Sequence, residues 1–196
     1  MKAQQKKSCV TSSGLTWHFE DLKDHHEQGL FELFKDPEVK QFFLGKNRPE
    51  DSLYKYLERA RNYSTLHEGQ YDFNKLIINE GNVIGFVSIA SYLPTWFSRE
   101  ERIHIGIRKL NTIMLIGYSI LGEYRRQGLV EQAVREMITS IHKNHGLRYF
   151  AATVNSQNIA SQNLLEKLGF VKLPNSIPNA DSDRFFLELP SSGDTF

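Results

Sequence analysis

The stretch from Ile113 to Ile141 places the strongest constraint on how this 196-residue chain can fold. Residues 113–121 are nearly all apolar, which is typical of a strand covered on both faces. A short basic loop around Gly128 leads into a segment whose apolar residues recur at the spacing of one helix face: Leu129, Val130, Ala133, Val134, Met137, Ile138 and Ile141. The sequence therefore predicts a buried strand that runs through a loop into a long amphipathic helix.

The loop between these two elements has the properties of an anion site. The first N–H groups of a helix have no intrahelical partner, and the helix dipole adds partial positive charge there. Arg125 and Arg126 add full charges, and Gly128 lets a ligand approach the backbone closely. The loop therefore predicts a phosphate or pyrophosphate site. An ordinary strand–turn–helix with a basic turn is the open alternative.

Two common phosphate-binding motifs are absent from this loop. A P-loop needs a Lys-Ser or Lys-Thr pair after its second glycine, and neither pair follows Gly128. A dinucleotide fingerprint needs G-x-G-x-x-G, and those glycines are missing as well. The absent P-loop lysine argues against a nucleotide-binding or phosphotransfer protein.

The rest of the chain alternates strands and helices after an initial meander. Expected strands cover 16–22, 71–79, 83–92, 113–121, 149–154, 170–173 and 184–189, and expected helices begin near residues 25, 49, 129 and 158. This order predicts an α/β fold with a mixed sheet. We expect one domain over residues 15–190, a loose N-terminal segment over 1–14 and a C-terminal tail over 191–196.

Composition excludes several classes of protein. The formal net charge is +1, so no overall field favours nucleic acid or membrane. The single cysteine, Cys9, excludes an internal disulfide and a cysteine metal cluster, and we expect no metal. No apolar run approaches the length of a membrane span, and no apolar segment follows the basic N-terminus as in a secretory signal. A cytoplasmic location is the default expectation.

A second group of polar residues precedes the last expected helix. Asn155, Asn158 and Ser161 lie three residues apart. Asn and Ser before a helix are good caps, which is the simpler interpretation. Capping needs only one such residue, however, and the helical spacing places Asn158 and Ser161 on one side of the helix. The alternative interpretation is a row of polar groups along the edge of a cleft.

These motifs together resemble the RimJ/RimL branch of the GNAT superfamily of N-acetyltransferases. The resemblance rests on N-x-x-S followed by L-L-E-K-L-G-F, downstream of I-G-Y-x-I and R-x-x-G, and on the Asp36-Pro37-Glu38-Val39 segment. It extends roughly over residues 15–173 with order and spacing preserved. The loop departs from the family pattern at Val130, where relatives carry Gly or Ala. The resemblance implies a GNAT fold with about six to seven strands, helices on the sheet and splayed central parallel strands.

The resemblance also implies a site for acetyl-CoA, the acyl-donor cosubstrate. Its pantetheine arm would pair with the end of the central strand at Ser119, Ile120 and Leu121. Asn155 and Asn158 are assigned to the cofactor too, with Asn158 hydrogen-bonding the pantetheine or the loop that holds it. The pyrophosphate would lie on backbone N–H groups of Arg126, Gln127, Gly128, Leu129, Val130 and Glu131, where the Glu131 carboxylate should point away.

The implied reaction is direct transfer of acetyl to an amine, which must be neutral to attack. Ser161 is the candidate proton donor to the leaving thiolate, and Tyr118 is a second candidate. Alternatively, Ser161 makes only local bonds and Tyr118 shapes the acceptor pocket. No general base is assigned. Many relatives carry Glu where Leu115 stands, and the nearby candidates look like solvated surface groups: Glu80, Glu100, Glu101, Glu123 and His104.

Residues 93–111 form an insertion where many relatives have a short turn. The alternation of Ile103, Ile105 and Ile107 predicts an added strand. Trp96 and Phe97 belong either to the core or to the acceptor pocket. Our hypothesis is that this insertion shapes acceptor specificity.

The leading functional hypothesis is an acetyl-CoA-dependent N-acetyltransferase. Its acceptor would be a protein N-terminus or a small amine such as a polyamine, an aminoglycoside or an amino sugar. The alternative is a GNAT fold that senses acyl-CoA without turnover. The expected partners are acetyl-CoA and the amine acceptor, without nucleic acid or membrane, in a monomer or a homodimer.

Overall fold

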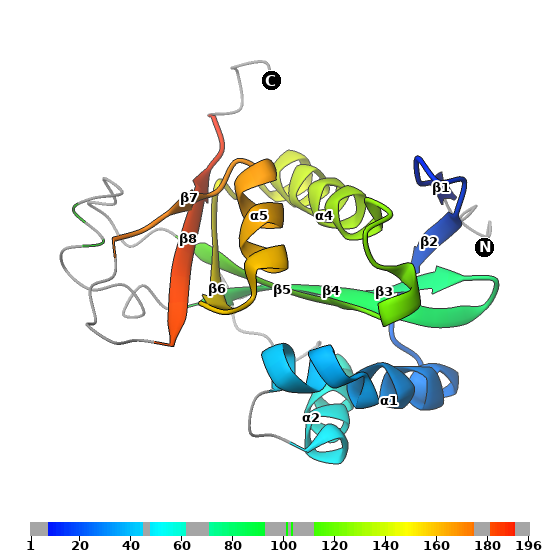
Figure 1. Ribbon diagram of the computed structural model, residues 1–196. Helices are drawn as coiled ribbons and strands as arrows, with labels where there is room; N and C mark the ends of the chain where they lie inside the picture. Colours follow the sequence, from blue (N-terminus) through cyan, green and yellow to red (C-terminus); the bar gives the residue numbers. More distant parts are fainter. Residues whose placement is uncertain are drawn as a thin grey trace. The chain divides into compact units, whose positions relative to one another are not determined.

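The computed structural model describes residues 8–44, 48–61, 71–92, 101, 103, 112–174 and 181–190 (Figure 1). Its strands are β1 (Cys9–Val10), β2 (Thr16–Glu20), β3 (Asp72–Asn79), β4 (Asn82–Tyr92), β5 (Ile113–Ile120), β6 (Tyr149–Asn155), β7 (Val171–Lys172) and β8 (Ser182–Glu188). Its α-helices are α1 (Glu27–Lys35), α2 (Pro49–Arg61), α4 (Leu129–His145) and α5 (Ile159–Lys167). Three shorter helical turns are η1 (Asp24–His26), η2 (Val39–Leu44) and η5 (Gly122–Tyr124). The predicted elements are present within one to two residues at most ends.

Within the described residues, one sheet carries eight strands in the order β1-β2-β3-β4-β5-β6-β8-β7. Strands β5 and β6 are parallel, with Ile113 opposite Tyr149, whereas β2–β3 and β6–β8 are antiparallel. The sheet is therefore mixed, as the alternation of strands and helices predicted. The eighth strand, which the sequence did not predict, is β1.

Cys9 and Val10 form β1, within the N-terminal segment 1–14 for which the sequence predicts a loose chain. These residues pair with β2, with Cys9 opposite Trp17. The Val10 carbonyl accepts a hydrogen bond from Gln132 Nε2 at 3.4 Å, a contact 122 positions away in sequence. Long-range partners of this kind are invisible to a local pattern of polar residues. Residues 1–7 and the expected tail 191–196 lie outside the described residues.

By its internal contacts the chain groups into two compact units. The first comprises Met1–Leu66, Phe73–Ser88 and Gly117–Val134, and the second comprises His67–Asp72, Ile89–Ile116 and Arg135–Phe196. Each unit has a hydrophobic cluster of its own.

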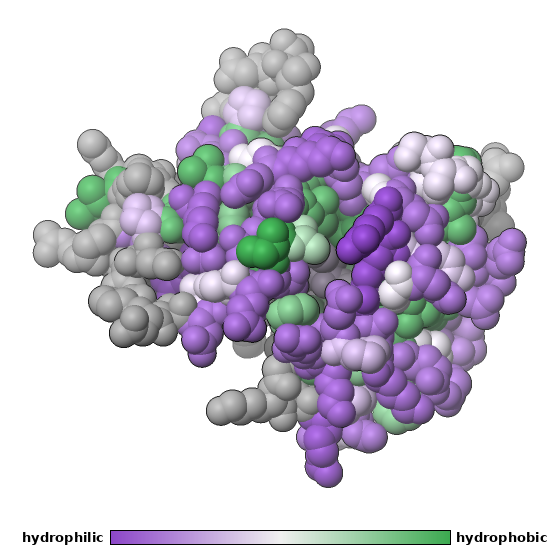
Figure 2. All heavy atoms as spheres, in the orientation of Figure 1, coloured by the Kyte–Doolittle hydropathy of each residue, from purple (hydrophilic) through white to green (hydrophobic). Residues whose placement is uncertain are grey.

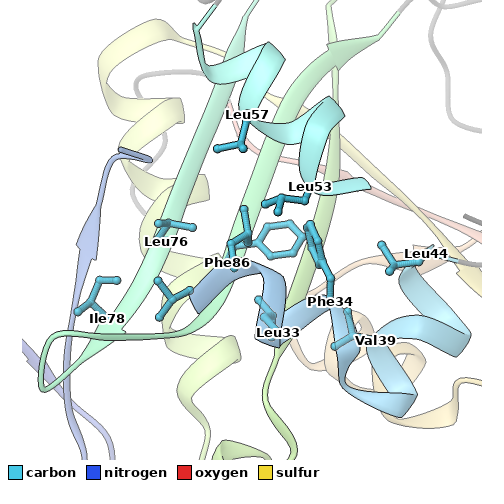
Figure 3. Packing of buried hydrophobic residues seen from close by; sticks show 11 residues of the cluster. Leu33, Phe34, Val39, Leu44, Leu53, Leu57, Leu76, Ile78 and Phe86 are labelled. Carbon is cyan, nitrogen blue, oxygen red and sulfur yellow. The ribbon is translucent and has the colours of Figure 1, made fainter. Parts of the chain in front are cut away.

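The core of the first unit is a cluster from α1, η2, α2, β3 and β4 (Figure 3). On α1, buried Leu30, Leu33 and Phe34 recur at the spacing of one helix face. The Phe34 ring meets the Phe86 ring edge-to-face with centroids 5.9 Å apart. Gly29 lets α1 approach β4, because a Cβ there would lie 2.9 Å from Val83 Cβ. These contacts fix α1 against β4.

The second unit is built around the β6–β8 ladder. The ladder runs from Tyr149 opposite Glu188 to Asn155 opposite Ser182. Ile113, Ala151, Leu173 and Phe186 form its buried cluster. Alternation along β6 directs Ala151 into this cluster, whereas Phe150, Ala152 and Val154 on the opposite face of the strand are buried as well.

The structure between β4 and β5 differs from the predicted insertion. Glu101 and Ile103 are its two described residues, and both have helical backbone. The predicted added strand is therefore wrong at Ile103, which is 71% exposed. Ile105, Ile107, Trp96 and Phe97 lie outside the described residues, so their predicted roles stay predictions.

The surface seen in Figure 2 is mostly hydrophilic, with hydrophobic residues scattered singly or in small groups. Such scattered residues are normal for a protein surface. Among the helices described, none combines the length and the apolar character that a membrane span requires.

Candidate active site

The loop that follows β5 turns back on itself twice before α4. Tyr124 N–H donates to the Leu121 carbonyl at 3.0 Å, and Arg125 N–H donates to the Gly122 carbonyl at 3.2 Å. Arg126 and Gly128 then have φ angles of +61° and +72°. Residues that alternate between the left-handed region and other conformations turn successive N–H groups toward one side, which forms a concave anion receptor.

The next feature of this loop is a run of backbone N–H groups that have no partner among the described residues. In the described part of the chain, the backbone N–H groups from Arg126 to Val130 donate no hydrogen bond to a protein group. The next intrahelical bond of α4 is Gln132 N–H to the Gly128 carbonyl, at 3.1 Å. A Cβ at Gly128 would find no atom within 4 Å, so the backbone there is open to a ligand. This geometry is compatible with the anion site that the sequence predicts, which stays a prediction.

The Gln127 side chain links this loop to itself and to the N-terminal segment. Gln127 Nε2 donates to the Glu123 carbonyl at 3.1 Å, and Gln127 Oε1 accepts from Ser13 Oγ at 3.0 Å. The Gln127 side chain is thus engaged within the protein, so a ligand meets its backbone rather than its amide group.

The Arg125 guanidinium faces carboxylates instead of the open side of the loop. It forms ion pairs with Asp36 and with Glu38 Oε1, the latter at 2.9 Å, and it donates to the Ile120 carbonyl at 3.1 Å. The prediction that Arg125 adds a full charge to the anion site is therefore wrong. Two acidic side chains balance that charge, and Arg125 connects the loop to Asp36 and to the end of β5.

The surroundings of Asp36 favour the ionised form of its carboxyl group. Burial opposes its ionisation, but the hydrogen bond from Arg125, the Val39 N–H, the Arg125 charge and the Gly122 N–H outweigh burial and lower the pKa of Asp36. The sequence marked Asp36 only as a helix end and as part of the family resemblance. Its link to Arg125 spans 89 positions, so no local signal could have revealed it.

The end of β5 is packed closely from two directions. A Cβ at Gly85 on β4 would lie 2.5 Å from the Ser119 carbonyl oxygen. A Cβ at Gly117 would lie 3.3 Å from Phe43 Cε2, so the Phe43 ring of η2 rests on the β5 backbone. Sequence reasoning missed Phe43, whose only signal was an aromatic pair after the first helix.

The direction of the β5 backbone groups follows from one hydrogen bond. Leu121 N–H donates to the Ile84 carbonyl of β4 at 2.9 Å. Successive residues of an extended chain present their backbone groups to opposite edges, so Ser119 shares the β4 edge with Leu121. Ile120 and Tyr118 therefore present their N–H and C=O groups to the other edge. Of the three predicted pantetheine partners, only Ile120 faces away from β4.

Asn155 and Asn158 make local bonds that shape the start of α5. Asn155 Oδ1 accepts from Gln157 N–H at 2.9 Å. Asn158 Oδ1 accepts from Ser161 N–H at 3.1 Å, so Asn158 is the N-cap of the helix. The capping interpretation is confirmed for this oxygen. An amide side chain also carries an NH₂ donor, which the cap does not use.

The predicted site residues thus fall into two groups. Ser119, Ile120, Leu121 and the loop from Arg126 to Glu131 belong to the first unit, together with half-buried Tyr118. Asn155, Asn158 and half-buried Ser161 belong to the second unit. Within its own unit, each group lies on contiguous backbone.

One of the acids expected at the surface is buried. Glu101 is 3% exposed, and its Oε2 lies 2.6 Å from Arg184 Nη1. The expectation of a solvated Glu101 is therefore wrong, and the ion pair explains how its charge is accommodated. Glu80 and Glu123 are exposed, whereas Glu100 and His104 lie outside the described residues.

Glu20, His25 and His26 form one group whose ligand atoms lie within 4.8 Å of one another. The His26 ring nitrogen Nδ1 accepts from Lys23 N–H at 3.2 Å. In neutral His26 the proton therefore resides on Nε2, which faces Glu20 Oε2 at 3.5 Å. A metal ligand needs a lone pair at that nitrogen, so the contact of His26 Nε2 with Glu20 is better explained as a polar contact than as a metal site.

Residues 18–171 match the sequence model of a protein family described as acetyltransferase (GNAT) domain. No curated protein matches the sequence closely enough to count as a relative.

Solved structures with the same fold include other acetyltransferases. The GNAT domain of S. lividans PAT has 14% identity and a TM-score of 0.71, over 94% of this chain and 97% of that one. The ribosomal-protein-S5-alanine acetyltransferase from Vibrio fischeri has 17% identity and a TM-score of 0.64, over 90% and 94%. RimL, a ribosomal L7/L12 alpha-N-protein acetyltransferase solved with coenzyme A, has 16% identity and a TM-score of 0.66, over 93% and 98%. At these identities the likeness shows the fold, which confirms the GNAT fold expected from the sequence.

Proposed function

The chain belongs to the GNAT acetyltransferase family, and we propose that it transfers an acetyl group from acetyl-CoA directly to a primary amine. The observation that carries this proposal is the unused set of backbone N–H groups from Arg126 to Val130 at the start of α4. A pyrophosphate supplies the negative oxygens that such groups bind.

In our proposal the pyrophosphate lies on the N–H groups from Arg126 to Glu131. The open backbone at Gly128 supports this position, because a ligand can approach without meeting a side chain. Val130 replaces a small residue of the family pattern, and its side chain is half-buried at the base of α4.

We place the pantetheine arm along the outer edge of the β5 end. The β5–β6 register runs from Ile113 opposite Tyr149 to Leu115 opposite Ala151, and β5 continues to Ile120. Because Ser119 and Leu121 face β4 and the Ile120 carbonyl accepts from Arg125, we narrow the expected backbone partners to the Ile120 N–H and Tyr118. The Asn158 NH₂ group would contribute a further hydrogen bond from α5.

The chemical step follows from the thioester. A neutral amine attacks the carbonyl carbon and the C–S bond breaks; the new amide nitrogen loses one proton, which balances the proton that the leaving thiolate gains. Ser161 is our candidate donor of that proton, and Tyr118 shapes the acceptor side. The Ser161→Ala variant should slow turnover while acetyl-CoA affinity stays nearly unchanged. Turnover equal to that of the wild type would refute the donor role.

The acceptor class is a protein N-terminus or a small amine. RimL and the Vibrio fischeri protein are described as acting on ribosomal proteins, which supports the first option through fold alone. We place the reaction in the cytoplasm, in a monomer or a homodimer. The competing function is a sensor that binds acyl-CoA without turnover. Leu115 supports this alternative, because many relatives carry Glu at that position.

Two measurements test this proposal. Calorimetry with acetyl-CoA, ATP and NAD should show binding of acetyl-CoA alone. Thiol release should then be followed on a panel of N-terminal peptides, polyamines, aminoglycosides and amino sugars. Release with one amine class supports the enzyme, whereas tight binding without release from any amine supports the sensor. Absence of acetyl-CoA binding would overturn both.

A further inference from the structure

The Asp36 carboxylate connects the end of α1 to the loop that follows β5. Its Oδ1 accepts from Glu38 N–H at 3.0 Å, from Val39 N–H at 3.1 Å and from Arg125 Nη2. Its Oδ2 accepts from Gly122 N–H at 3.1 Å. The Asp36 side chain is 11% exposed, so these partners replace most of its hydration. All of these residues belong to the first unit.

Two of these donors lie in the loop itself. Gly122 begins the loop, and Arg125 directly precedes Arg126, whose φ of +61° starts the concave N–H receptor. The Arg125 guanidinium also holds the Ile120 carbonyl at 3.1 Å, at the last residue of β5. One carboxylate therefore restrains the loop at its entry and, through Arg125, at the residue before the receptor.

We propose that Asp36 is a positioning residue of the acetyl-CoA site, which fixes the pyrophosphate loop through Arg125 and the Gly122 N–H. This proposal rests on the function proposed above. Asp36 touches no substrate atom. It holds the loop in the conformation in which the receptor N–H groups converge, so that binding does not have to order the loop.

The carboxylate is chemically required at this position. All four of its partners are donors, and a carboxylate offers acceptors only. An asparagine has the same shape, but its NH₂ group would face either Arg125 or the Gly122 N–H. At least one loop contact would be lost, with little change in volume.

Glu38 provides a matched comparison. Its carboxylate also pairs with Arg125, at 2.9 Å, but its side chain is 59% exposed. Exposed ion pairs contribute little, because water competes for both partners. Removing the Glu38 charge should therefore leave the loop in place.

The experiment compares Asp36→Asn, Glu38→Gln and the wild-type protein in titrations with acetyl-CoA and with acetyl-pantetheine, which lacks the pyrophosphate. Titrations followed by NMR detect weak acetyl-pantetheine binding. We expect Asp36→Asn to weaken acetyl-CoA binding roughly tenfold, with acetyl-pantetheine binding unchanged. Glu38→Gln should change neither dissociation constant by more than about twofold.

Different outcomes address different claims. If the wild type fails to bind acetyl-CoA, the proposed function fails and the positioning role fails with it. If the wild type binds and Asp36→Asn binds equally well, only the positioning role is overturned. An equal loss for both probes would also overturn it, because a general structural defect does not distinguish them.

A second variant covers the case in which Asp36→Asn does not fold. Arg125→Gln breaks the same link from the loop side and leaves intact the hydrogen bonds that Asp36 accepts from Glu38 N–H and Val39 N–H. It should weaken acetyl-CoA binding by a similar factor and leave the dissociation constant of acetyl-pantetheine unchanged. Unchanged acetyl-CoA binding by a folded Arg125→Gln protein would contradict the proposal.

Discussion

Gly85 on β4 lies directly against the backbone of Ser119 on β5, where a Cβ at Gly85 would be only 2.5 Å from the Ser119 carbonyl oxygen. The same Cβ would be 2.8 Å from Ile120 Cδ1. No side-chain rearrangement can relieve a contact with backbone, so the strand end itself must move. The glycine therefore sets the position of the β5 end beside the proposed pantetheine arm.

We expect Gly85→Ala to destabilise the protein by about 1–3 kcal/mol, because the methyl group overpacks a closed contact. Urea denaturation measures this change. Acetyl-CoA affinity should fall too, since Ile120 would shift. A variant as stable as the wild type would show that the β4–β5 contact is looser than described.

Gly128→Ala tests whether the open backbone of the loop is used by a ligand. Gly146 offers a matched control, because its φ is +66° and a Cβ there also meets no atom within 4 Å. Either alanine should cost about 1–2 kcal/mol of stability from its left-handed conformation. Only Gly128→Ala should weaken acetyl-CoA binding, as measured by calorimetry. Equal affinities for the two variants would argue against the pyrophosphate position.

Asn158 combines a structural and a proposed functional role, which one substitution can separate. Asn158→Asp keeps the oxygen that caps α5, so thermal stability should stay close to that of the wild type. It removes the NH₂ donor proposed for pantetheine, so acetyl-CoA affinity should fall. Asn158→Ala should lose about 1 kcal/mol of stability as well. Wild-type affinity in a stable Asn158→Asp protein would leave Asn158 as a cap alone.

The lowered pKa of Asp36 predicts a pH dependence of stability. A carboxyl group whose pKa is lower in the folded than in the unfolded protein stabilises the fold above the unfolded value, near 3.8. That contribution is lost as pH falls from there through the folded pKa. The difference in unfolding free energy between wild type and Asp36→Asn should be constant at neutral pH and shrink in acid. A difference that grows in acid would contradict the ion pair with Arg125.

The sequence predicted the elements that depend on local periodicity and on the Gly and Pro residues at element ends. Residue spacing predicts the apolar face of α4. Backbone chemistry predicts the end of α4 just before Gly146 and the start of α2 at Pro49. The position of the loop around Gly128 was predictable for the same reason, because its glycine and the helix start are adjacent in sequence.

The parts that could not be predicted depend on partners distant in sequence. Strand β1 is held by β2 and by Gln132, Arg125 is paired with Asp36, and Glu101 is buried against Arg184. Each residue alone looks like an ordinary surface group, and only the fold brings its partner near. The Asn158 cap differs, since the sequence supported both the cap and the ligand role.

The most direct test of the central claim is to follow backbone amide resonances while acetyl-CoA is added to isotopically labelled protein. If this loop binds the pyrophosphate, the largest shifts occur at the N–H groups from Arg126 to Val130, with smaller shifts at Ile120. Shifts concentrated elsewhere, with these amides unchanged at saturation, would contradict the assignment of this loop as the pyrophosphate site.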